Sequence, residues 1–413
     1  MDSLRRTVAV LSGTVFLVMI GISIIVPALP QYGLGLSGSA FLAGVLVGAL
    51  PVARVVLDLP SGAFGDRFGN RRMMQIGLGI IASASLVPVI VFDYWILLAV
   101  RVAEGVGSAF YVTSSLAALA KRVPAERRGR YMGIYVNGLL TGQIIGPAIG
   151  GAIVLRFGSS VPAAPFAAYA LFAFVGFLLV TFGMERTRMG GMASRVDIPA
   201  VRRLLRDRSY MLVTMGTMGT FFVRAGLIST VLPLFIHLNW GVDPTLAITY
   251  TGVLVTTNAF ATLLTLYPSG WLADRVGRKV PFVASLLLTA AISPFLFLTT
   301  NIATAVPIMF LYGLALGLHG PLAAWTTDLT PREIMGTSMG LYRTLTDLGF
   351  LLGPVVLAAV GQLTMVGGRM TVAPFVVAAV WVAASGVLMA FARDPIGEAR
   401  KRAQASGQPG NST

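Results

Sequence analysis

Long apolar stretches, separated by short polar segments, run along almost the whole chain. A helix needs roughly 20 mostly apolar residues to cross a bilayer. Twelve stretches suit this requirement, so we predict an all-α integral membrane protein. Prolines inside several stretches fit this reading, because neighbouring groups satisfy the freed backbone groups in membrane helices. The predicted spans are 7–29, 39–64, 73–92, 95–120, 131–155, 164–184, 210–236, 247–272, 281–299, 304–327, 337–362 and 373–392.

Composition supports the membrane assignment. Hydrophobic residues make up 56% of the chain and charged residues 11%, whereas soluble domains carry about 25% charged residues. The sequence between the spans is too short for an enzyme-sized domain. It contains no HExxH motif, phosphate-binding loop or nucleophile elbow, so we predict neither enzyme activity nor ATP-driven pumping. Cysteine is absent, which excludes disulfides and thiolate metal sites, and we expect no cofactor.

The basic residues lie mainly on one side of the predicted spans. If the N-terminus is cytoplasmic, that side holds 25 Lys and Arg, while the outer loops hold only Arg156 and Arg369. This asymmetry predicts a multi-pass protein of the plasma or bacterial inner membrane with both termini in the cytoplasm. The net charge of +15 then faces anionic lipid. Nucleic-acid binding is not expected, because no soluble basic module remains to carry it.

The chain repeats itself at an offset of 207–208 residues. The segment from Pro60 to Gly69 matches that from Pro268 to Gly277, and Gly142-x-x-x-Gly146-Pro147 matches Gly349-x-x-x-Gly353-Pro354. Six spans per copy give both copies the same orientation. We therefore predict two six-helix bundles related by an axis along the membrane normal.

The repeat divides the chain into four parts. We predict a bundle over 1–184, a cytoplasmic linker over 185–209, a second bundle over 210–392 and a cytoplasmic tail over 393–413. In the linker, Val201, Leu204 and Leu205 form an apolar face among arginines, which indicates a helix lying at the membrane interface. A solvated linker is the alternative.

The loop after the second span reads Gly62-Ala-Phe-Gly-Asp66-Arg67-Phe-Gly69-Asn-Arg71-Arg72, and the second copy runs from Gly270 to Lys279. Both resemble the signature between the second and third helices of the major facilitator superfamily. The resemblance implies the major facilitator fold. It also implies a cytoplasmic latch that holds one end state. Plain topogenic charge is the alternative. The latch residues would be Gly62, Asp66, Arg67, Arg71, Asp274 and Arg275.

Motifs in the fourth and fifth spans resemble those of particular branches of the superfamily. Leu98-x-x-Arg101-x-x-Glu104-Gly105 is similar to the arginine motif of proton-coupled members. The run of Gly142, Gly146, Pro147 and Gly150 looks like the antiporter motif of drug:proton antiporters. Judged from the residues alone, Arg101 and Glu104 share a helix face, where they could exchange a proton or neutralise each other structurally. The glycines could equally serve helix packing.

Four charges in the second and eleventh spans form a pattern. Arg54 and Asp58 lie one helical turn apart, as do Arg343 and Asp347. In the superfamily these two helices face each other across the halves. Counting about 1.5 Å per residue from the cytoplasmic ends puts Asp58 ~12 Å and Arg343 ~10 Å deep. Arg54 and Asp347 lie ~18 Å and ~16 Å deep.

The matched depths predict that Asp58 meets Arg343 and that Arg54 meets Asp347. We call these four residues the charge quartet, and we expect it to close the cytoplasmic side. Protonation of either Asp would weaken it and so couple protons to gating. Two intrahelical pairs that never meet are the alternative.

The resemblance places the first, fourth, seventh and tenth helices around a substrate cavity. Arg224 could bind an anionic group there, or could snorkel or bind backbone carbonyls. His319 precedes Gly320-Pro321, which suggests a helix break, and a structural role suits it better. The candidates for the cavity are Arg101, Glu104, Phe221, Arg224 and His319.

These patterns predict a secondary active transporter that exports small organic, amphipathic or drug-like molecules against protons by alternating access. Its proton-coupling candidates are Glu104, Arg101, Asp58 and Asp347, and one chain holds both halves, so a monomer suffices. The first span lacks the acidic residue that some multidrug exporters carry. A proton symporter or facilitator importing a small metabolite is the alternative. A non-transporting receptor or scaffold is an alternative of another class.

Overall fold

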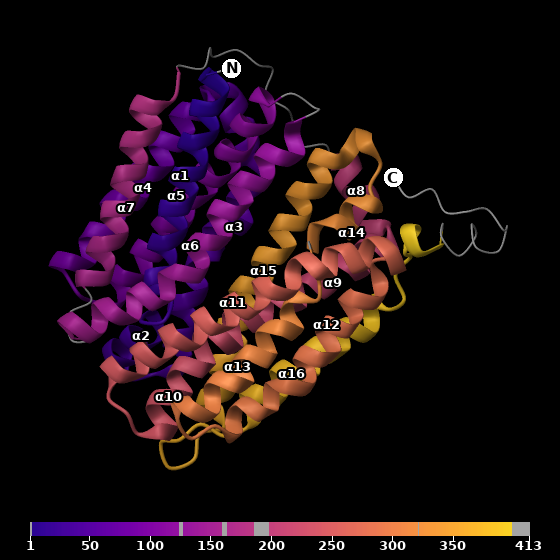
Figure 1. Cartoon of the computed structure of the whole chain (residues 1–413). Coiled ribbons are helices and arrows are strands. Elements are labelled where there is room, and N and C mark those ends of the chain that lie inside the picture. The colour runs from indigo at the N-terminus through magenta and orange to yellow at the C-terminus, as the bar shows by residue number, and fades with distance from the viewer. Residues whose placement is uncertain (1, 124–126, 159–162, 186–197, 321, 399–413) are drawn as a thin grey trace.

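The computed structural model describes residues 2–123, 127–158, 163–185, 198–320 and 322–398. The described part is helical apart from turns and one isolated β-bridge between Val366 and Arg369. Within these described ranges, ten helices are long and apolar enough to cross a membrane, and the shorter apolar helices Ile302–Gly317 and Ala373–Met389 complete the predicted twelve. Figure 1 shows them as two groups of long helices side by side.

Two helices of the N-terminal half begin at polar caps. The Ser39 hydroxyl accepts a hydrogen bond from the Leu42 amide, and Asp93 accepts from the amides of Trp95 and Ile96. The first predicted span is longer than expected and is interrupted around Pro27, a residue that cannot continue the hydrogen-bond ladder. The helices are α1 (Asp2–Ile25), α2 (Leu29–Ser37), α3 (Ala40–Phe68), α4 (Asn70–Ile90), α5 (Tyr94–Arg122), α6 (Arg128–Phe157) and α7 (Ala163–Gly183).

The C-terminal half has the same plan with more irregular helices. The seventh predicted span contains a π-helix, the ninth ends in a 3-10 helix from Ser293, and the tenth is broken after Gly317. The elements are α8 (Ile198–Arg206), α9 (Arg208–Val223), η2 (Arg224–Val231), α10 (Leu232–Trp240), α11 (Pro244–Val276), α12 (Lys279–Ile292), η3 (Ser293–Leu298), α13 (Ile302–Gly317), α14 (Leu322–Asp328), η4 (Arg332–Ile334), α15 (Met335–Leu363) and α16 (Ala373–Met389).

The segment between the halves is helical where it is described. Residues 186–197 of the predicted linker and 399–413 of the predicted tail lie outside the described residues. The amphipathic stretch forms α8, as its apolar periodicity indicates. Leu204 is buried against Tyr210 and Leu341, while Ile198 and Leu205 are exposed. Part of the predicted apolar face is therefore used to pack α8 against the C-terminal half.

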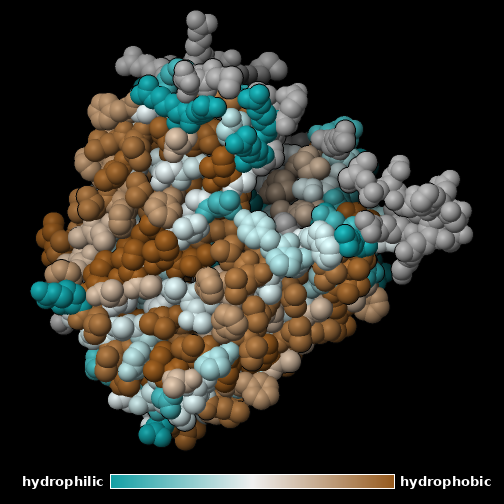
Figure 2. Space-filling model, in the orientation of Figure 1, coloured by the Kyte–Doolittle hydropathy of each residue, from teal (hydrophilic) through white to brown (hydrophobic). Residues whose placement is uncertain are grey.

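The two halves meet along two seams, α3 against α15 and α6 against α11. The start of α1 and the end of α16 lie at the same end of the molecule, which we call the terminal end (Figure 1). At the opposite end, Gln31 Nε2 donates to the Pro233 carbonyl at 2.7 Å, and the Ala40 amide donates to Gln362 Oε1 at 2.8 Å. Figure 2 shows a recess between the halves toward the terminal end. The halves are thus joined at the opposite end in this conformation.

The flanks are apolar, as a bilayer requires. Large apolar side chains such as Phe174, Trp271 and Leu311 are exposed there. Apolar residues cover most of the flank in Figure 2, and hydrophilic residues gather at the ends. Exposed apolar surface on this scale marks contact with lipid rather than water.

Candidate transport site

The charge quartet lies on the seam between α3 and α15. Arg54 Nη2 lies 2.9 Å from Asp347 Oδ1, and Arg343 Nε lies 3.5 Å from Asp58 Oδ2. Both cross-bundle contacts predicted from the matched depths are present. The alternative of two intrahelical pairs does not describe this conformation, because each arginine reaches a carboxylate of the other half.

The two aspartates of the quartet are incompletely satisfied. Their side chains are 1% and 2% exposed. Both oxygens of Asp58 and Oδ2 of Asp347 are buried without a hydrogen-bond partner among the described residues. An ionised carboxylate that is buried without enough hydrogen-bond donors is unfavourable, and protonation removes this cost. The quartet therefore offers a place for a proton.

Arg101 and Glu104 form an ion pair inside the N-terminal half. Arg101 Nη1 contacts Glu104 Oε2, and Glu104 Oε1 accepts a hydrogen bond of 2.6 Å from the Ser85 hydroxyl on α4. Arg101 is 5% exposed and Glu104 is fully buried. In this conformation the carboxylate faces α4 within its own half, and the expectation that this pair lines the substrate cavity stays a prediction. Sequence reasoning missed Ser85, since a lone serine in a span gives no signal.

Arg224 and Phe221 lie where the halves approach each other. Arg224 Nη2 donates to Gln143 Oε1 of α6 at 3.2 Å, so this side chain reaches across to the other half. Phe221, one turn earlier, packs on Phe350 with ring centroids 4.8 Å apart. Both Arg224 and Phe221 are half-buried. A role of these two residues in substrate contact stays a prediction.

His319 is held within the C-terminal half. It follows α13 in the predicted helix break, where Gly320 has a φ of 59°. The His319 Nδ1 contacts the Gly320 carbonyl at 2.6 Å, and its ring lies 6.3 Å from that of Phe282. These contacts agree with a structural role for His319, which the sequence favoured over substrate binding.

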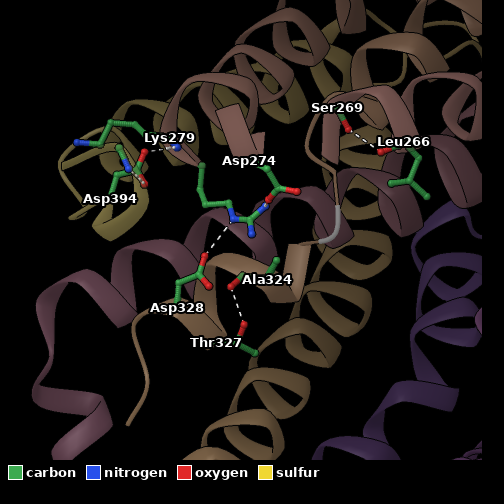
Figure 3. Close-up of polar contacts among 10 residues, drawn as sticks. Leu266, Ser269, Asp274, Lys279, Ala324, Thr327, Asp328 and Asp394 are labelled. Atoms are coloured by element: carbon green, nitrogen blue, oxygen red, sulfur yellow. Dashed lines mark hydrogen bonds and ion pairs between the residues drawn. The ribbon is translucent and has the colours of Figure 1, made fainter. Parts of the chain in front are cut away.

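The second signature copy makes polar contacts within its own half (Figure 3). Arg278 bridges Asp274 at 2.8 Å and Asp328 of α14 at 3.0 Å. The Lys279 amide donates to Asp394, whose carboxylate also crowds Gly277, a glycine with a φ of 97°. Sequence reasoning missed Asp328 and Asp394, because loop acids are common and neither belongs to the repeat.

The described contacts of the other arginines predicted for the latch lie within their own halves. Arg275 stacks on the Trp271 ring at 3.8 Å, Arg67 is exposed beside Phe68, and Arg71 donates to the Thr181 carbonyl. Gly62 and Asp66 belong to α3, and the side chain of Asp66 lies outside the described residues.

The glycines of the fifth predicted span pack α6 against α1. A Cβ added to Gly142 would lie 2.7 Å from the Phe16 carbonyl oxygen, and one on Gly150 would lie 2.1 Å from that of Ile24. Gly146 faces Ser23 in the same way, and Pro147 lies within α6. Close backbone approach of this kind requires small residues. The contact that the packing interpretation requires is therefore present.

Known proteins share this architecture. The family model described as Major Facilitator Superfamily matches residues 11–354 and 215–411. The multi-drug resistance efflux pump PmrA of Streptococcus pneumoniae is 25% identical over 357 residues, covering 84% of this chain and 86% of that protein. Multidrug resistance protein 2 of Bacillus subtilis is 26% identical over 361 residues, with coverage of 84% and 86%.

A solved structure matches over the whole chain. It is a bacterial homologue of the human lysosomal transporter Spinster in an inward-facing and occupied conformation. The TM-score is 0.71 at 18% sequence identity, and the match covers 98% of both chains. At this identity the match shows a shared fold.

Proposed function

The chain belongs to the Major Facilitator Superfamily, and we propose that it exports small organic molecules in exchange for protons by alternating access. Membership makes it a multi-pass membrane transporter rather than an enzyme. Two relatives carry names of multidrug efflux proteins, which supports export of drug-like molecules. The observation that carries the proton coupling is the charge quartet, with buried carboxylate oxygens that have no hydrogen-bond donor.

In this proposal the quartet links proton binding to the contact between the halves. With both aspartates ionised, Arg54 and Arg343 hold α3 to α15 across the seam. A proton taken up by Asp58 or Asp347 cancels one negative charge and weakens an ion pair across the seam. The halves then separate more easily along this seam. The quartet is formed here while the recess lies toward the terminal end (Figure 2). It would therefore hold the halves together in the state that is open at the terminal end, and not close the cytoplasmic side as the sequence predicted. The signature copies would act at the terminal end as a latch in the opposite state.

Glu104 is the second proton-coupling candidate. It is the one carboxylate inside the spans whose partners, Arg101 and Ser85, belong to a single half. A proton on Glu104 would change the charge inside the N-terminal half without changing an ion pair between the halves. Comparing Glu104 with Asp58 therefore separates coupling through the seam from coupling within one half.

We place the protein in the plasma membrane with the terminal end in the cytoplasm and acting as a monomer. The 25-to-2 distribution of Lys and Arg supports this orientation, and the bacterial relatives support the location. The basic terminal end would then face anionic lipid, with α8 at the interface.

Proton flux in liposomes tests the proposed function. Purified protein would be reconstituted with a pH dye inside the vesicles, and cationic, neutral and anionic dyes would be added as candidate substrates. We expect the wild type to show proton movement when substrate is added. This movement should be lost in Asp58→Asn or in Glu104→Gln, and the inactive variant identifies the carboxylate that couples proton movement to transport. Glu398→Gln is the matched control, since Glu398 is exposed and far from both seams in sequence. Substrate crossing without proton movement would mean that the protein is a uniporter and not a proton exchanger.

A further inference from the structure

The charged side chains inside the spans do not balance. Away from the helix ends, the spans hold four arginines and three carboxylates. Three of the arginines each pair with a different carboxylate, in the two pairs of the charge quartet and in Arg101–Glu104. Arg224 is the fourth. Among the described residues, its guanidinium contacts a neutral amide, that of Gln143, and no carboxylate.

Arg224 is placed where a transported molecule can reach it. Its guanidinium extends from the C-terminal half to Gln143 on α6 of the N-terminal half. Gln143 in turn lies against Met19 of α1, with Nε2 3.8 Å from Sδ. Arg224 and Gln143 are both half-buried, so neither is sealed inside one bundle. The cation thus lies between the halves, whose separation gives alternating access.

The backbone at Arg224 departs from the α-helix. Arg224 is the first residue of the π-helix η2, which continues to Val231. The Ser229 hydroxyl donates to the Arg224 carbonyl at 3.1 Å, and the Thr230 hydroxyl donates to the Ala225 carbonyl at 2.8 Å. Gly226 packs closely against Gly353 of α15. π-helical turns recur at functional sites, and here side-chain hydroxyls and a glycine contact support one.

A permanently charged guanidinium in a membrane interior is unfavourable without a counter-charge. No described carboxylate supplies one, whereas a ligand could. The planar fork of the guanidinium suits carboxylate, sulfonate or phosphate oxygens. Phe221 and Phe350 offer apolar ring surface one turn away. We infer that Arg224, with Gln143, binds the oxyanion of an amphipathic substrate whose apolar part lies on these rings.

This inference rests on the proposed transport function, and it names the substrate class as organic anions. It is tested by binding to the full-length protein in nanodiscs, without any gradient. Three probes share one fluorophore: N-dansylglycine is anionic, dansylamide is neutral and dansylcadaverine is cationic. We expect the wild type to bind the anionic probe at least tenfold more tightly than the neutral one. Arg224→Gln should remove this preference, and Arg224→Lys should retain part of it.

Arg369→Gln is the matched control, because Arg369 is exposed in a loop and should keep the full preference. Arg224→Gln should also unfold at the same temperature as the wild type or higher, since it removes an uncompensated charge. N-dansylglycine should raise the melting temperature of the wild type and leave that of Arg224→Gln unchanged.

The inference is overturned if the wild type fails to prefer the anionic probe, including the case in which no probe binds. It is overturned equally if Arg224→Gln keeps the preference. Loss of proton coupling in liposomes would leave this binding result intact, so the failure of one proposal is distinguishable from the failure of the other.

Discussion

Ion pairs of the same chemistry have different consequences here, depending on whether both residues belong to one half. Arg101 and Glu104 stay together however the halves move, because both lie on α5. Arg54 and Asp347 lie on α3 and α15 and must separate when these helices do. A pair that forms and breaks during transport can carry a coupling signal, whereas a permanent pair mainly stabilises its own bundle.

Charge exchange tests the pairing of Asp58 with Arg343. Asp58→Arg alone should abolish transport, because it places three cations on the seam. Adding Arg343→Asp restores an opposite pair, and we expect at least a tenth of wild-type flux in liposomes. Combining Asp58→Arg with Arg369→Asp is the control, since Arg369 is exposed and far from the quartet along the chain. Equal inactivity of both double variants would refute the pairing as a functional contact.

Removal of one partner from the permanent pair should damage the fold more than removal of both. Arg101→Gln leaves Glu104 buried with a single donor, Ser85. We expect a loss of about 3–5 kcal/mol in the free energy of unfolding. Arg101→Gln with Glu104→Gln should recover most of it. The free energies of unfolding of the single and double variants are measured in detergent from the helical circular dichroism signal. A single variant as stable as the double one would contradict the prediction that the unpaired buried charge is destabilising.

At the scale of elements, the sequence predicted where helices lie better than where they are interrupted. Each span has an apolar run long enough for a bilayer, and that signal is strong. The break after Gly317 was indicated by Gly320-Pro321. The π-helix η2 was not predicted, because it depends on the Gly226–Gly353 contact and on hydroxyls that bond to carbonyls five residues back. These are tertiary and side-chain effects that apolar periodicity does not report.

The contact between α1 and α6 gives a prediction at this scale. Gly150→Ala should lower the free energy of unfolding by about 1–3 kcal/mol, since its Cβ would lie 2.1 Å from the Ile24 carbonyl oxygen. Gly133→Ala on the same helix has open space around the new Cβ and should be neutral or slightly stabilising. Thermal unfolding in detergent compares them. Equal effects of both substitutions would argue against helix packing as the role of Gly150.

At the scale of the molecule, the two seams explain why the site was only partly predictable. The partners in the quartet could be predicted from the depth of each residue in the membrane. Once the ends of two neighbouring helices are known, the rise per residue fixes the depth of every residue between them. The rotation of α5 did not follow from sequence. It turns Glu104 toward Ser85, and only the packed bundle decides that direction. Arg224 could be located in a span from sequence. That no described carboxylate pairs with it became visible only once the other ion pairs were placed.

The halves are joined at the end opposite the termini. The proposed exporter, with its terminal end in the cytoplasm, must open that opposite end to release its substrate. The chain has no native cysteine, so a reactive pair can be introduced without background. Ala40→Cys with Gln362→Cys places thiols on opposite halves, where the Ala40 amide now meets the Gln362 side chain. A short bifunctional thiol reagent should link them and stop transport in liposomes, and a cleavable version of the reagent should restore it on reduction.

The matched control is Asn239→Cys with Met370→Cys, a pair whose native residues bond to each other within the C-terminal half. Linking it should leave at least half of the flux, because neither seam is joined. Alternating access requires the opposite end to open in every cycle, so the linked cross-half pair can complete no turnover. Undiminished flux through fully linked protein would mean that substrate passes without separation of α3 from α15 at this end. The quartet on the same seam would then lose its role as the group that senses the movement.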